Sequence, residues 1–211
     1  MKEEIIVISL GGSLIIPDEI DINFLKDFKR LILSQVEEGK KFVIVTGGGK
    51  ICRKYQAVAK ELSNPTPADL DMIGIQALNL NAELVRILFK EYKNVEVHGA
   101  ENPGNSTDFV AVLMAKNIGA KKIINLSNTD YVYDSDPKIN PNAKKFEQIS
   151  WPEYRKLIPK EWNPGLNSPF DPVASEMAEK EGMEVIIMNG KPIDNLTNYL
   201  NGGKFQGTVI K

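Results

Sequence analysis

Two glycine-rich loops, each at the end of an apolar run, are the clearest candidates for chemistry in this chain. The run 5–10 ends in Gly11-Gly12-Ser13, and the run 42–46 ends in Gly47-Gly48-Gly49. Glycine lacks a Cβ atom, so its backbone can approach a ligand closely and direct N–H groups at an anion beside a helix N-terminus. Two such loops suggest two phosphorylated ligands, one donating and one accepting. A tight strand-to-helix turn explains either loop equally well when it is taken alone.

Two basic residues, Arg53 and Lys54, follow the second glycine-rich loop within about one turn of the expected helix. The planar guanidinium group matches phosphate oxygens better than an ammonium group does. A cation near a helix N-terminus opposes the helix dipole, and a bound phosphate would compensate it. A solvated basic face is the alternative interpretation.

A third candidate is the start of the helix expected at 107–118. Ser106 or Thr107 is a good N-cap, and Asp108 in the first turn favours the helix dipole, so capping alone explains these residues. In the functional interpretation, Thr107 contacts a phosphate and Asp108 points into the cleft to orient a charged group.

A polar loop after the apolar residues 123–126 is the fourth candidate. Its aromatic faces can stack on a nucleobase, and its carboxylates can hold ribose hydroxyls or Mg²⁺ through water. An Asx-rich turn is the alternative, since Asp and Asn satisfy their own backbone in loops. The residues of interest are Ser127, Asn128, Asp130, Tyr133, Asp136 and Pro137.

Apolar runs alternate with amphipathic stretches along the chain, which predicts an α/β fold: a mostly parallel sheet covered by helices on both faces. The segment 127–148 lacks helical periodicity and follows a strand, where α/β proteins bind ligands. The predicted strands are 5–10, 42–46, 95–98, 122–126, 184–188 and 207–210, and the predicted helices are 22–38, 50–61, 69–91, 107–118, 151–158, 171–181 and 192–200.

Composition narrows the class of protein. The chain has 211 residues, 42% of them hydrophobic, which fits one domain, and its formal net charge of -2 predicts no nucleic-acid or membrane partner. Cys52 is the only cysteine and His98 the only histidine, which disfavours disulfides, a serine-histidine-aspartate triad and a cysteine- or histidine-ligated metal. The N-terminal apolar run is too short for a signal peptide or a membrane span, so a cytoplasmic location is expected.

The segment 69–91 is more apolar than one sheet face requires. Packing against a second subunit and deep burial in the core are both consistent with this pattern.

An ordered set of motifs, covering nearly the whole chain, resembles the amino acid kinase family and, within it, the archaeal type of uridine monophosphate kinase. The matching segments are residues 8–13, 47–55, 71–76, 103–108, 128–137, 171–174 and 207–210. Each match is weak by itself, and the order of the set carries the resemblance.

This resemblance implies an open three-layer αβα sandwich formed by residues 1–211, with the acceptor over the N-terminal half and ATP over the C-terminal half. It implies transfer of the ATP γ-phosphoryl group to UMP with Mg²⁺, in a homo-oligomer (dimer or hexamer). Gly11, Gly12 and Ser13 would meet the transferring phosphates, while Gly47, Gly48, Gly49, Arg53 and Thr107 would hold the monophosphate. Asp71 would reach the acceptor ribose, and Asp108 and Asp171 would lie near the reacting groups. The ATP pocket would be formed by Ser127, Asn128, Asp130, Tyr133, Asp136 and Pro137.

The chain departs from the family pattern at three places. Ser9 stands where many members have lysine, Tyr131 stands where members usually have glycine, and the connection between the 69–91 helix and the strand near Val95 is short. Two alternatives therefore stay open: a kinase for another small acceptor (carbamate, an amino acid or an isoprenoid phosphate), or a nucleotide-binding sensor or storage subunit without catalysis.

Overall fold

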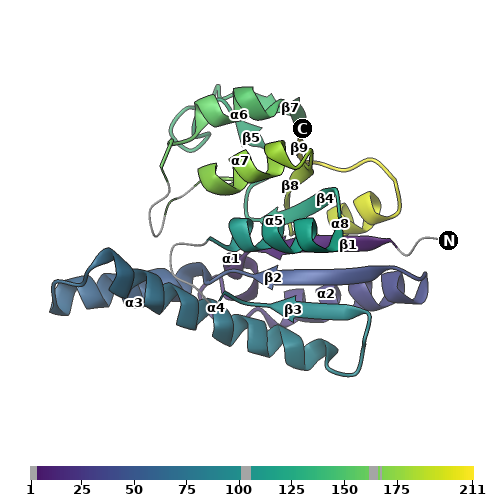
Figure 1. Cartoon of the computed structure of the whole chain (residues 1–211), viewed down its shortest axis with the longest axis horizontal. Helices are drawn as coiled ribbons and strands as arrows, with labels where there is room; N and C mark the ends of the chain where they lie inside the picture. Colours follow the sequence, from purple (N-terminus) through teal and green to yellow (C-terminus); the bar gives the residue numbers. More distant parts are fainter. Residues whose placement is uncertain (1–3, 101–105, 162–165, 167) are drawn as a thin grey trace.

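A mostly parallel sheet forms the centre of the molecule (Figure 1). The computed structural model describes residues 4–100, 106–161, 166 and 168–211. In this described part, the main sheet has seven strands in the order β3-β2-β1-β4-β8-β9-β7. The strands are β1 (Ile5–Leu10), β2 (Lys41–Thr46), β3 (Val95–His98), β4 (Lys122–Ser127), β7 (Gln148–Ile149), β8 (Glu184–Asn189) and β9 (Thr208–Ile210).

The register of these strands brings their carboxyl ends to one edge. Leu10, at the end of β1, pairs with Thr46 of β2 and with Leu126 of β4. Ser127, which ends β4, pairs with Asn189, which ends β8. The loops that follow these four parallel strands therefore emerge side by side, as is usual for ligand sites in this fold class.

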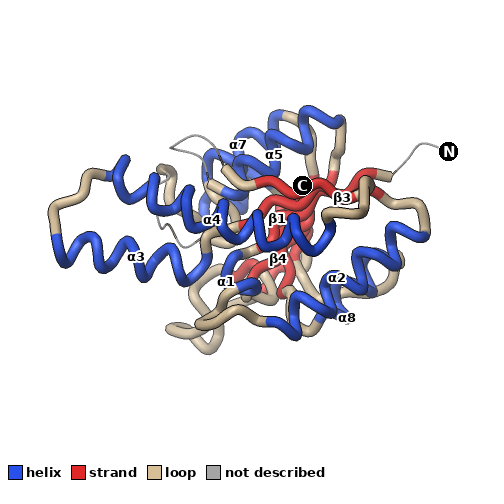
Figure 2. The backbone as a smooth tube through the Cα atoms, turned by 90° about the horizontal axis from the view of Figure 1, so that it is seen from below, coloured by secondary structure: helices blue, strands red, loops and turns tan. Residues whose placement is uncertain are grey.

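Helices cover both faces of the sheet, which confirms the α/β sandwich. Figure 2 shows α5 and α7 on one side of the strands, and α2 and α8 on the other. One buried apolar cluster joins the sheet to α5, α6 and α7, and a second joins it to α1, α2 and α8. The helices are α1 (Gly12–Ile15), α2 (Ile22–Glu37), α3 (Gly49–Leu62), α4 (Pro67–Phe89), α5 (Thr107–Ile118), α6 (Trp151–Leu157), α7 (Pro172–Lys180) and α8 (Ile193–Leu200).

Helix α4 is buried in the core along one face, which is one of the two interpretations that its sequence left open. One face is buried, including Ile75, Val85 and Phe89, whereas Met72 and Leu80 on another face are 44% and 69% exposed. Within the described residues, α4 is the helix long and apolar enough to cross a membrane by length and composition, with a hydropathy of 1.2. Its burial against the sheet accounts for part of that apolar character.

The elements that the sequence did not predict are short. They are the four-residue helix α1, the two-residue strands β5 (Val132–Tyr133) and β6 (Lys145–Phe146) inside the polar 127–148 segment, and the two-residue strand β7 at its end. Periodicity needs a longer window to be recognised, so such elements escape it. Strand β9 was predicted, but its direction was not: it runs antiparallel to β8.

Candidate active site

The two glycine-rich loops lie against each other at the carboxyl edge of the sheet. The first is anchored to β4, because the Gly11 N–H donates to the Leu126 carbonyl at 2.8 Å. A Cβ atom on Gly12 would lie 2.3 Å from the Gly47 oxygen and 2.3 Å from the Gly49 nitrogen. Both obstructing atoms belong to the backbone and cannot rotate away, so glycine is required at position 12.

Helix α3 starts inside the second glycine-rich loop, with Gly49 at a φ of +66°. A Cβ atom there would lie 2.9 Å from the Ser13 nitrogen, so the N-termini of α1 and α3 adjoin. The buried Asn81 of α4 supports the same loop by donating from Nδ2 to the Gly47 carbonyl at 2.8 Å. The Thr107 Oγ1 atom lies 3.5 Å from the position of a Cβ on Gly47, so Thr107 lies beside the second glycine-rich loop.

Arg53 lies on α3, which starts in the second loop, and Asp71 lies on α4. Arg53 is exposed, and Asp71 is only 9% exposed. Burial raises the pKa of the Cys52 thiol, while the charge of Arg53 lowers it and the charge of Asp71 raises it. Cys52 in turn lies against Gly48, where a Cβ would come within 2.9 Å of the Cys52 Cβ.

Asp108 and Asp171 meet on the face of the sheet covered by α5 and α7. The Asp171 backbone N–H donates to Asp108 Oδ2 at 3.1 Å. Asp171 also caps α7, accepting at Oδ1 from the N–H groups of Val173 and Ala174, and its Oδ2 accepts from Ser106 Oγ. These contacts join two acids that lie 63 residues apart in the sequence.

The environment of this acidic pair disfavours its charges. Burial, and then the charge of Asp171, raise the pKa of Asp108 from 3.8 to about 7. Burial also raises the pKa of Asp171. A buried carboxyl group whose pKa lies near neutral pH is a candidate for a functional role.

Two lysines flank the glycine-rich loops and pair with acids of the segment that leads into α2. The Lys50 Nζ atom, at the start of α3, lies 2.5 Å from Asp18 Oδ1. Lys191, in the loop after β8, pairs with Asp21, the N-cap of α2. Both lysine side chains stay more than 40% exposed, so an incoming anion can compete for them.

Of the residues predicted in the loop after β4, Asp130 lines a cavity, whereas Asp136 and Pro137 are exposed. Asp130 Oδ1 accepts from Asn189 Nδ2 at 2.8 Å, and Asp130 lines a cavity of about 350 Å³ together with Lys191. Asp136 Oδ1 accepts from the Lys138 N–H, which is the Asx turn offered above as the alternative interpretation. Asp136 and Pro137 are exposed, and no contact between them and the glycine-rich loops appears among the described interactions.

Other predicted residues of this region have the following places. Ser127 ends β4 and its Oγ accepts from the Thr129 N–H, while Asn128 is exposed. The rings of Tyr131 and Tyr133 meet edge-on at 6.3 Å between centroids. Residues 103–105 of the 103–108 motif lie outside the described residues.

Besides Lys191, four uncharged polar residues of the site were not proposed from the sequence as site residues: Ser9, Asn81, Ser106 and Asn125. Ser9 and Asn125 each interrupt an apolar strand, and Asn81 interrupts an apolar helix. Such interruptions were a usable signal, because a buried polar side chain requires a hydrogen-bond partner. The identity of the partner was not available from the sequence.

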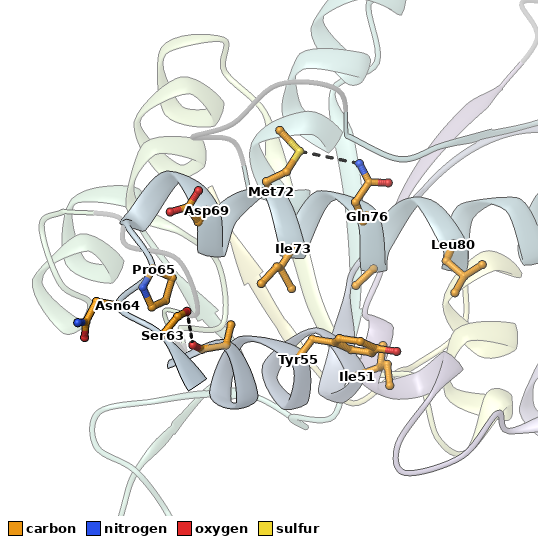
Figure 3. Close-up of a pocket in the computed structure, with 12 residues that line it drawn as sticks. Ile51, Tyr55, Ser63, Asn64, Pro65, Asp69, Met72, Ile73, Gln76 and Leu80 are labelled. Atoms are coloured by element: carbon orange, nitrogen blue, oxygen red, sulfur yellow. Dashed lines mark hydrogen bonds between the residues drawn. The ribbon is translucent and has the colours of Figure 1, made fainter. Parts of the chain in front are cut away.

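An apolar groove of about 660 Å³ separates the outer faces of α3 and α4 (Figure 3). Figure 3 shows Ile51 and Tyr55 of α3 facing Ile73 and Leu80 of α4 across it. Tyr55 is 62% exposed and Leu80 is 69% exposed. The groove is therefore a solvent-facing apolar surface, and neither Asp108 nor Asp171 lines it.

Comparison with known proteins shows which family the chain is similar to. The model of the amino acid kinase family matches residues 4–101 and 95–189. Uridylate kinase of Pyrococcus abyssi is 32% identical over 225 aligned residues, covering 98% of this chain and 99% of that protein. Uridylate kinase of Thermoplasma acidophilum is 35% identical, covering 98% and 96%.

A solved structure agrees with these sequence relatives. The crystal structure of uridylate kinase from Archaeoglobus fulgidus superposes with a TM-score of 0.78 at 31% identity, over 99% of this chain and 100% of that chain. Paired glycine-rich loops at the carboxyl edge of an αβα sandwich, with matches along nearly the full length, lead to one conclusion. The chain belongs to the amino acid kinase family.

Proposed function

We propose that this protein transfers the γ-phosphoryl group of ATP to uridine monophosphate. The observation that carries the proposal is the backbone contact between the two glycine-rich loops, with the Gly12 and Gly47 backbones in van der Waals range. Two loops so close together, each ending a parallel strand, can hold two polyanions near enough for in-line transfer. The names of the full-length relatives supply the acceptor, uridine monophosphate.

The residues present fit ATP. Gly11, Gly12 and Ser13 lead into and open α1, and without large side chains their backbone would be able to approach phosphate oxygens closely. Among the described residues, no three His, Cys, Asp or Glu side chains gather into a metal site. Magnesium would accordingly be held chiefly by the phosphate oxygens and water, where it would neutralise phosphate charge.

The acceptor would lie over the N-terminal half of a single domain and ATP over the C-terminal half. Arg53, Thr107 and the second glycine-rich loop would hold the monophosphate, and Asp71 its ribose. Lys50 and Lys191, each now paired with an aspartate, would supply positive charge that Ser9 cannot. A phosphate oxygen is already nucleophilic, so positioning and charge neutralisation would provide most of the rate.

The test is an ADP-release assay with MgATP and a panel of acceptors: UMP, CMP, AMP, GMP, carbamate, aspartate and isopentenyl phosphate. We expect the highest kcat/KM with UMP. A higher value with an acceptor that lacks a phosphate would replace the proposed acceptor. Tight ATP binding without phosphorylation of any of them would replace the enzyme by a nucleotide-binding subunit.

The pH dependence of kcat/KM for UMP is expected to show an acid limb centred near pH 7. Asp108 has a pKa raised to about 7 by burial, and its ionised form is the one that can orient a charged group. Activity should therefore rise as pH increases through 7. In Asp108→Asn this limb should disappear, leaving the ionisation of the substrate phosphate near pH 6. An unchanged limb in the variant would exclude Asp108 as its source.

We also infer a homo-oligomer, because the groove between α3 and α4 leaves Tyr55, Met72 and Leu80 exposed. Light scattering of the purified protein should give a multiple of the 23.5 kDa chain mass. Leu80→Glu should shift it to 23.5 kDa without unfolding it. Leu62→Glu is the control, since Leu62 is 79% exposed on α3 but does not line the groove. A monomeric wild-type protein at micromolar concentration would contradict this inference.

The location proposed for this enzyme is the cytoplasm, with small nucleotides as its ligands. The near-neutral charge and the single cysteine support this proposal.

A further inference from the structure

Asn125 is a polar residue at the centre of a buried parallel strand. Its neighbours on β4, Ile124 and Leu126, are at most 1% exposed, and Asn125 itself is 4% exposed. Its register partner on β1 is Ser9, which is 3% exposed and also stands among apolar residues. A primary amide in this setting is costly unless its polar atoms are hydrogen-bonded.

The side-chain amide of Asn125 donates twice. Nδ2 lies 3.0 Å from Asp108 Oδ1 and 3.2 Å from the backbone oxygen of Pro169. Ser9 Oγ donates to the same Asp108 oxygen at 3.2 Å, and the Asp171 N–H donates to the other oxygen. Pro169 lies two residues before Asp171, so the contacts close a ring that joins β4, the start of α5 and the segment before α7.

We infer that Asn125 is a positioning residue, which fixes the orientation of the Asp108 carboxyl group and ties it to the segment that carries Asp171. This inference rests on the proposed phosphoryl transfer. Asp108 receives neutral donors from β1 and β4. The orientation of Asp108 depends on these donors, because a carboxyl group held at both oxygens cannot rotate about its terminal bond.

Two titratable groups face Asp108 from neighbouring elements, Asp171 at the N-terminus of α7 and Tyr154 of α6. The Tyr154 hydroxyl is occupied by the backbone of Phe170, donating to its oxygen at 2.6 Å and accepting from its nitrogen at 2.7 Å. The donors from Ser9, Asn125 and the Asp171 backbone favour the ionised form of Asp108, against burial and the charge of Asp171. Loss of the Asn125 donor therefore raises the pKa of Asp108.

The test compares Asn125→Leu, which keeps the branched shape of the side chain and removes the donor, with Gln35→Met. Gln35 is a matched control: it is 2% exposed, its amide donates to Glu38 and Asn201, and it lies on α2, away from the acidic pair. With MgATP and UMP, Asn125→Leu should lower kcat by about 10- to 100-fold, as expected for misplacement of a reacting group, with KM values changed less than about threefold. The acid limb should move to higher pH. Gln35→Met should lower the melting temperature and change neither kinetic property.

A double variant separates positioning from general loss of packing. If Asn125 acts through Asp108, adding Asn125→Leu to Asp108→Asn should lower kcat no further. Additive losses, or a kcat and acid limb in Asn125→Leu like those of Gln35→Met, would overturn the inference. Should Asn125→Leu not fold, Asn125→Ala removes the same donor without adding bulk.

A measurement without substrate keeps this inference distinct from the proposed function. Carboxyl ¹³C NMR of Asp108, assigned with Asp108→Asn, should give a higher pKa in Asn125→Leu than in the wild-type protein. An unchanged pKa would overturn the positioning role even in an active kinase. A raised pKa in a protein that does not phosphorylate UMP would retain the contact and reject the proposed reaction.

Discussion

Replacement of Arg53 by alanine is expected to lower turnover with UMP by about three to five orders of magnitude, by analogy with arginines that stabilise transferring phosphates. Arg53 is exposed on α3, the helix that starts in the second glycine-rich loop. Its guanidinium group would neutralise charge on the acceptor phosphate, and no other residue of α3 offers the same planar donor geometry. Steady-state kinetics of Arg53→Ala with saturating MgATP would measure the effect.

Lys60→Ala provides the control for Arg53, because it removes the same charge from the exposed last turn of the same helix. Its turnover should stay close to that of the wild-type protein. Arg53→Lys should recover only part of the loss, because lysine keeps the charge but not the bidentate geometry. Near-normal turnover of Arg53→Ala would remove Arg53 from the proposed acceptor site.

The second large effect is expected for Gly12→Ala. The added methyl group would lie 2.3 Å from two backbone atoms of the second glycine-rich loop, so the two loops must separate. A displacement of about 1 Å between reacting groups can cost about 100-fold in rate, and we expect at least that loss in kcat. The KM values for ATP and UMP should both rise, since each loop would hold one nucleotide.

Gly39→Ala distinguishes loss of the site from loss of stability. Gly39 follows α2 with a φ of +92°, and a Cβ there would meet nothing within 4 Å. Alanine at that φ strains the backbone by about 1 to 2 kcal/mol, so the melting temperature should fall while kcat stays unchanged. Full activity of Gly12→Ala at an unaltered melting temperature would show that the contact between the loops is not needed for transfer.

Most of the architecture was predictable from local sequence. The strands at 5–10 and 95–98 and the helix at 107–118 agree with β1, β3 and α5 in both bounds. Long apolar runs and regular helical periodicity predict burial directly, since every residue of the element contributes to the pattern. The start of α4 at Pro67 differs from the predicted boundary. A capping box between Thr66 and Asp69 begins this helix two residues before the predicted position.

The positions and spacing of the glycines were sufficient to predict both glycine-rich loops, because the absence of Cβ atoms can be read directly from the sequence. The carboxyl ends of parallel strands also had to share an edge once the α/β pattern was recognised. The direct contact of Gly12 with Gly47 and Gly49 was not predictable. It depends on the register of β1 with β2, which is set by packing of both sheet faces.

Only the tertiary structure decided what the buried polar residues do. Ser9, Asp108, Asn125 and Asp171 lie on four different elements, and nothing in their local sequence names one as the partner of another. The sequence by itself determined which elements form, because secondary structure and burial follow from patterns within a few turns of chain. The chemistry of the acidic pair required the fold, because a carboxyl pKa depends on desolvation and on charges brought together from distant positions.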